Sequence, residues 1–188
     1  MLGIDIKQAI ERYLEPHPIT WCGKEAQVCE GRVQLPALVN DANYSQSIYN
    51  QMVGYGFHEL GHIRYTDEAP WDWAIQNHGS YLGHLINGLE DVRIEKIMIE
   101  AGVNQYFFEA ATNASLENGY VVGNERKDIP FLLAVEGRRL NGYRLTCQSI
   151  LDETPWSIEL WRALKQVRSA SSTGAVVSIA LRLYRSMS

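Results

Sequence analysis

The stretch SQSIYNQMVGYGFHELGHIRYT, residues 45–66, predicts the first long helix of this chain and carries its most informative motif. Apolar residues recur in it at helical spacing, and Asn43 or Ser45 is suited to cap its start. Within it, His58-Glu59-Leu60-Gly61-His62 has the form H-E-x-x-H. Residues four apart lie on one face of a helix, so both imidazoles can reach the same ion.

This motif predicts a metal centre with a general base beside it. Imidazole nitrogens suit Zn²⁺, and a catalytic zinc keeps three protein ligands and one open position for water. Glu59 lies to the side of the histidine pair, where it can accept a proton from a water that the metal activates. Gly54 and Gly61 lie near His58 and His62 on the helix. Their small size leaves room for a close neighbour or a ligand.

We expect the third ligand on a second long helix, residues 80–101. Apolar residues cover most of its circumference, which predicts a buried helix. Glu90 lies among them, and a buried carboxylate needs a partner such as a divalent cation. Glu90 is therefore the first candidate, with a buried salt bridge to Arg93 or Arg64 as the alternative reading. Asp91, in a polar stripe of this helix, is the other candidate, as a ligand or as an acceptor for a ligand histidine.

Other polar residues are candidates for lesser roles. Peptide hydrolysis needs a donor for the developing oxyanion, and Tyr65 and His84 are possible donors or supporting residues. Tyr65 lies close to His62 on the same helix face, and His84 lies in the polar stripe of the second helix. Arg138 and Arg139 are interpreted as part of a solvated helix face.

The whole pattern predicts an α+β fold, mainly helical with a small antiparallel sheet near the N-terminus. The strand region covers about residues 18–36, and the proposed metal-binding helices cover about 45–66 and 80–101. A helical part, 103–188, follows. We find no linker or repeat, so residues 1–188 are expected to form a single domain.

The remaining segments are predicted from their periodicity and their glycines and prolines. Residues 67–73 and 118–128 are expected to be loops. Shorter helices are expected at residues 6–14, 105–116, 130–140, 155–168 and 173–184.

Composition limits the class of protein. Seventeen Lys and Arg against 22 Asp and Glu give a net charge of −5, so nucleic acid is not expected as a partner. The three cysteines form no C-x-x-C pair, so a thiolate zinc site and a disulfide framework are not expected. No apolar run is long enough for a membrane span, and the N-terminus is too charged for a signal segment. We expect a cytoplasmic protein.

The two motifs together resemble known metallopeptidases. H-E-x-x-H on one helix, with an acidic residue on a later helix, is similar to the gluzincin arrangement of zinc metallopeptidases. Residues 58–67, HELGHIRYTD, followed by 87–95, NGLEDVRIE, resemble the metallopeptidase-like domain of proteins related to the cobaltochelatase T subunit, which has phage and bacterial versions. The resemblance covers residues 45–100. It implies that the extended segment 32–36 is an edge strand above the metal.

The chain departs from these relatives in two ways. Such domains usually precede a von Willebrand factor A domain, which these 188 residues do not include, so we expect either a stand-alone version or a fragment of a longer protein. Thermolysin-like enzymes also place an Asp four residues after the ligand Glu, to orient a histidine. Ile94 holds that position here, whereas Asp91 and Glu95 would recreate the pair with the acids exchanged.

The resemblance implies a zinc-dependent metallopeptidase in which His58, His62 and Glu90, or alternatively Asp91, hold Zn²⁺ and Glu59 is the general base. Its substrate would be a peptide or protein. The alternative is a zinc-binding but catalytically silent module that works with an AAA+ ATPase or a von Willebrand factor A partner. Both readings allow a protein partner and involve neither nucleic acid nor membrane.

Overall fold

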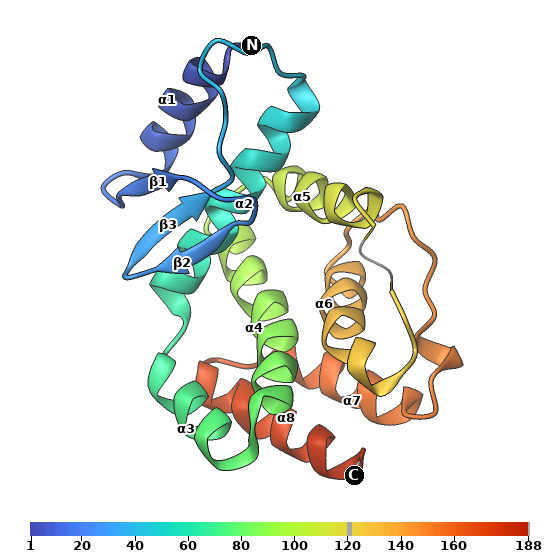
Figure 1. The fold of residues 1–188 in the computed structure, drawn as a ribbon. Coiled ribbons are helices and arrows are strands. Elements are labelled where there is room, and N and C mark those ends of the chain that lie inside the picture. Colours follow the sequence, from blue (N-terminus) through green and yellow to red (C-terminus); the bar gives the residue numbers. More distant parts are fainter. Residues whose placement is uncertain (120–121, 188) are drawn as a thin grey trace.

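The structure, a computed structural model, describes residues 1–119 and 122–187. Within these residues the chain is mainly helical, with one small sheet near the N-terminus, which confirms the predicted α+β class (Figure 1). The elements are α1 Gly3–Leu14, β1 Ile19–Trp21, β2 Gln27–Cys29, β3 Arg32–Leu35, α2 Gln46–Tyr65, α3 Glu68–His78, α4 Ser80–Glu100, α5 Gln105–Glu117, α6 Ile129–Leu140, α7 Ser157–Val167 and α8 Thr173–Ser186. Short 3-10 turns lie at Arg126–Asp128 and Leu151–Glu153.

The sheet is mixed, and the prediction of a purely antiparallel sheet was wrong for its first strand. The order is β1-β3-β2. β2 and β3 form the predicted hairpin, because Glu30 and Gly31 both adopt the positive φ angles that a tight two-residue turn requires. β1 instead pairs parallel to β3, with Ile19 opposite Val33. β3 is therefore the central strand, and β1 and β2 are the two edge strands. The prediction that the segment 32–36 is an edge strand was wrong.

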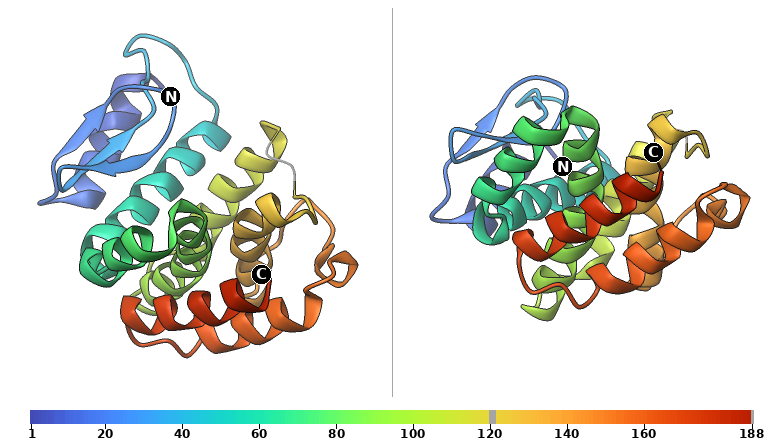
Figure 2. Two further views of the ribbon diagram at one scale, coloured as in Figure 1. Left: turned by 60° about the horizontal axis from the view of Figure 1, so that its bottom comes forward. Right: turned by 90° about the horizontal axis from the view of Figure 1, so that it is seen from below.

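Two apolar clusters form the interior. One lies among α1, β3, α2 and α5 and includes Leu60 and Phe108. The other lies among α3, α4, α6, α7 and α8 and includes Leu89 and Leu132. Helix α4 passes between them near the middle of the molecule, and its Met98 belongs to the first cluster (Figures 1 and 2). Helices α2 and α4 thus meet where the two clusters adjoin.

Residues 67–73, predicted as a loop, instead begin helix α3. The Asp67 carboxylate accepts a hydrogen bond from the backbone N–H of Ala69 and caps the helix. Pro70 lies in the first turn, where a missing N–H leaves no helical hydrogen bond unmade. The other predicted loop, 118–128, contains a short 3-10 turn, and its residues 120–121 lie outside the described residues.

Helix α4 is the longest helix, with 21 residues, and carries several charged side chains. In the described ranges, no helix is both long enough and apolar enough to cross a membrane.

Candidate metal centre

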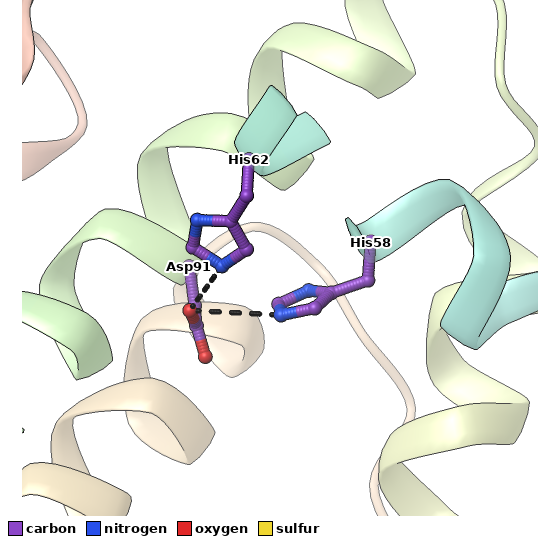
Figure 3. A group of neighbouring side chains, drawn as sticks. All are labelled: His58, His62 and Asp91. Atoms are coloured by element: carbon purple, nitrogen blue, oxygen red, sulfur yellow. Dashed lines mark ion pairs between the residues drawn. The ribbon is translucent and has the colours of Figure 1, made fainter. Parts of the chain in front are cut away.

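Helices α2 and α4 bring three potential metal ligands together. His58 and His62 project from α2 toward Asp91 of α4 (Figure 3). The Asp91 Oδ1 atom lies 3.3 Å from His62 Nε2 and 3.7 Å from His58 Nε2. The three ligand atoms all lie within 4.8 Å of one another. Two nitrogens and one oxygen therefore converge on one small volume.

The surroundings and spacing of Asp91 Oδ1 are those of a possible metal ligand. Asp91 is 6% exposed, and its Oδ1 atom has no hydrogen-bond partner among the described residues. Its charge is balanced in part by ion-pair contacts with the Nε2 atoms of His58 and His62. In a tetrahedral zinc site, bond lengths of about 2.0–2.1 Å place neighbouring ligand atoms about 3.3 Å apart. The two distances from Asp91 to the histidines are close to that spacing.

Both histidines are oriented through the ring nitrogen that faces away from Asp91. His58 Nδ1 lies 2.7 Å from Glu95 Oε1. His62 Nδ1 lies 3.1 Å from Thr66 Oγ1, whose hydroxyl donates to the Glu90 carboxylate at 3.0 Å. When the imidazoles are neutral, acceptors at Nδ1 favour the tautomer that carries its proton there, which leaves the Nε2 lone pair available to a metal ion.

Glu90, the first candidate for the third ligand, belongs to a different group of residues. It is fully buried, and Arg93 binds both of its oxygens, at 2.8 and 2.5 Å. Thr66 and Thr173 also donate to it. The alternative reading of Glu90 as a salt bridge to Arg93 therefore matches the structure. Asp91, the second candidate, is the carboxylate that the structure brings to the histidines.

Two supporting residues were not identified from the sequence. Arg138 is 8% exposed, so its interpretation as part of a solvated face was wrong. Its guanidinium contacts Glu95 at 2.6 Å and Asp91 at 3.3 Å. Tyr143 is buried, and its hydroxyl donates to Glu95 at 2.8 Å. The tight packing of α6 on α4 buries Arg138, and local periodicity carries no signal of that packing.

Burial and neighbouring charges shift the pKa values of His58, Asp91 and Glu59. Burial alone would lower the pKa of His58, but the carboxylates of Asp91 and Glu95 outweigh it and raise that pKa to about 9. Burial would raise the pKa of Asp91, but the imidazoles and Arg138 hold it well below its usual range. The pKa of Glu59 is raised because burial penalises its charge, although the two imidazoles partly offset that effect. A raised pKa suits a carboxylate that must accept and return a proton.

A cleft of about 860 Å³ opens on the histidines and Glu59. Its far walls are β2, through Gln27 and Val28, and the first turns of α3. A second hollow of about 640 Å³ lies toward α5, and the two share Ala26, His58 and Glu59 as lining residues. The H-E-x-x-H residues therefore lie where two hollows adjoin.

The two candidate oxyanion donors lie outside this cleft lining. The Tyr65 side chain packs against the apolar cluster of α1, α2 and α5, and its backbone carbonyl accepts from Arg93 at 2.6 Å. His84 lines a smaller hollow between α4 and α6, together with Asn87. Asn87 also lines the main cleft. Its polar side chain therefore lies between the main cleft and the smaller hollow that His84 lines.

No protein-family model, curated protein or solved structure matches this chain.

Proposed function

We propose that the protein is a zinc-dependent metallopeptidase of the H-E-x-x-H class, with His58, His62 and Asp91, in place of the Glu of the gluzincin arrangement, as its zinc ligands. The observation that carries this proposal is the convergence of three ligand atoms: the buried Oδ1 of Asp91 lies 3.3 Å from His62 Nε2 and 3.7 Å from His58 Nε2. The Asp91–Glu95 pair on α4 supports it, because Glu95 contacts His58 from four residues beyond the ligand acid. This is the gluzincin pairing with the acids exchanged.

Each residue has a distinct part in the proposed hydrolysis. When bound, zinc would polarise the scissile carbonyl and lower the pKa of water. Glu59, at the cleft wall beside the histidines, accepts the proton of the attacking water and returns it to the leaving amine. Glu95 and Thr66 contact Nδ1 of His58 and His62 and so keep the two Nε2 atoms directed toward Asp91, where they would hold the ion.

The cleft favours an extended polypeptide as substrate. β2 is at the edge of the sheet and lines the cleft, so its unpaired side offers backbone hydrogen bonds to an added strand. The second hollow shares His58 and Glu59 with the cleft and extends toward α5. A chain that passes from one hollow to the other would present an internal bond to Glu59, so we propose endopeptidase activity.

The cytoplasm is the compartment that we propose for this activity. Cys22, Cys29 and Cys147 are all free, and two of them are exposed. Free exposed thiols persist in a reducing compartment.

The test is cleavage of a peptide library by the zinc-loaded protein, read by mass spectrometry. We expect cleavage by the wild type and a loss of roughly 10²- to 10⁴-fold in Glu59→Gln, because that variant lacks the base. Glu68→Gln is the matched control, since Glu68 lines the same cleft but is exposed and lies outside the ligand cluster. A wild type that binds zinc and cleaves nothing would favour the silent interaction module instead.

A further inference from the structure

Arg138 contacts both carboxylates of α4 that face the histidines. Its Nη2 lies 3.3 Å from Asp91 Oδ2 and 2.6 Å from Glu95 Oε1. Its Nε donates to Glu95 Oε2 at 2.9 Å. Asp91 and Glu95 lie one helical turn apart, so one guanidinium spans them. A planar fork of donors can do this, whereas a single ammonium cannot satisfy both carboxylates in the same way.

The contact between Arg138 and Asp91 gives the two carboxylate oxygens of Asp91 different surroundings. Arg138 holds Oδ2, and Oδ1 is left without a hydrogen-bond partner while it faces both imidazoles. A carboxylate with one oxygen bound in this way offers the other oxygen alone to an ion. The contact with Glu95 acts on a second ligand, because the same Glu95 accepts from His58 Nδ1 at 2.7 Å.

We propose that Arg138 is a positioning residue of the zinc site: it makes Asp91 a one-oxygen ligand and holds Glu95 against His58. This inference rests on the proposed zinc site. Tyr143 assists from the loop after α6, since its hydroxyl donates to Glu95 Oε2 at 2.8 Å. Among the described residues, the partners of Arg138 are the two acids and not the histidines, so Arg138 acts on the histidines through Asp91 and Glu95.

The neighbouring arginines have other partners. Arg93 binds Glu90 one turn away on its own helix and the carbonyl of Tyr65, so it holds Glu90 away from the histidines. Arg139 binds Glu136 of its own helix and the carbonyl of Cys147. Arg138 differs from both, because its partners lie on another helix and both face ligand histidines.

The experiment measures zinc affinity by chelator competition and the visible spectrum of the cobalt(II) form. We expect Arg138→Met to weaken zinc binding by roughly 10- to 100-fold, the usual effect of losing a residue that orients ligands. We also expect weaker visible cobalt bands, because a freed Asp91 can bind with both oxygens and raise the coordination number. A residue with only a structural role would not change that spectrum.

Three further variants keep the result interpretable. Arg138→Lys retains the charge without the fork and should recover part of the affinity, and Tyr143→Phe, which removes one bond to Glu95, should show a smaller loss. Arg139→Met is the matched control and should leave affinity and spectrum unchanged.

If Arg138→Met does not fold, Arg138→Lys and Tyr143→Phe carry the test. Wild-type affinity and spectrum in the folded Arg138 and Tyr143 variants would overturn the inference. A wild type that binds no zinc would overturn the proposed site itself and this inference with it.

Discussion

At the scale of single residues, the candidate site depends on two adjacent acids with opposite surroundings. Glu90 is bound by Arg93 and two threonine hydroxyls, so its charge is already compensated. Asp91 has one oxygen at Arg138 and one oxygen with no hydrogen-bond partner in the described part of the chain. Burial alone does not identify a ligand; the feature that separates the two acids is that an oxygen of Asp91, and none of Glu90, lies close to the Nε2 atoms of both histidines.

The sequence predicted the residues that helix α2 contributes to this site, but it did not decide which acid of α4 completes it. The H-E-x-x-H spacing identified His58, Glu59 and His62, because helical geometry relates residues four apart without any tertiary information. The choice between Glu90 and Asp91 needed contacts that local spacing does not encode. Thr173 and Arg138 are distant in sequence and reach the site only through the packing of α8 and α6 on α4.

Replacement of Asp91 should mainly change zinc affinity, whereas replacement of Glu90 should mainly change the free energy of unfolding. We expect Asp91→Asn to lower zinc affinity by more than roughly 100-fold, because it removes a charged ligand and not merely a residue that orients one. Glu90→Gln should instead lower the free energy of unfolding by about 3–5 kcal/mol, because Arg93 is left buried without its partner. Chelator competition and urea denaturation of both variants measure the two effects. The reverse pattern would make Glu90 the ligand.

The pKa of His58 predicts a pH dependence of stability in the metal-free protein. This pKa is raised to about 9, above the unfolded value, so protonated His58 stabilises the folded state. The contribution is complete below about pH 6.5 and is lost as pH rises toward 9. We expect the wild type to lose on the order of 1–3 kcal/mol across that range relative to His58→Gln. Urea denaturation in EDTA at several pH values measures it, and equal slopes for the two proteins would contradict it.

At the scale of elements, α4 is held close to α6 by small residues. A Cβ at Gly88 would overlap the backbone carbonyl of Pro130, and a Cβ at Gly137 would overlap the side chain of Val92. This approach brings Arg138 to Asp91 and Glu95. The positions of the helices other than α3 followed from their periodicity. Their neighbours and the parallel pairing of β1 depend on contacts between distant segments, which local patterns do not specify.

The requirement for Gly88 at the crossing of α4 and α6 can be tested by substitution. We expect Gly88→Ala to lower the free energy of unfolding by about 1–3 kcal/mol, because the overlap with Pro130 is with backbone and cannot be relieved by a rotamer change. Gly174→Ala, in α8, is the matched control, since the nearest atom to its Cβ lies 3.9 Å away. Chemical denaturation should show the control to be at least as stable as the wild type. Equal stability of both variants would show that the close α4–α6 crossing is not required.

At the scale of the whole molecule, the candidate site joins two apolar clusters. His58 and His62 come from α2, which belongs to the cluster with α1 and α5, and Asp91 comes from α4, which lies mainly in the other. A zinc ion bound by all three would link the two parts of the interior.

Zinc should therefore stabilise the whole fold. A ligand that binds only the folded state at 100 times its Kd adds about 2.7 kcal/mol. We expect thermal unfolding to occur at a higher temperature with zinc than with EDTA, and the difference to vanish in His62→Ala. A calorimetric scan measures both. An equal rise in His62→Ala would place the stabilising zinc elsewhere on the protein.

The most direct measurement of the central claim is an anomalous difference map, recorded at the zinc absorption edge, from crystals of zinc-loaded Glu59→Gln. We predict one strong peak about 2.0–2.1 Å from Nε2 of His58, Nε2 of His62 and Oδ1 of Asp91. No peak between the two histidines, or a peak there that Glu90 and not Asp91 contacts, would contradict the proposed metal centre.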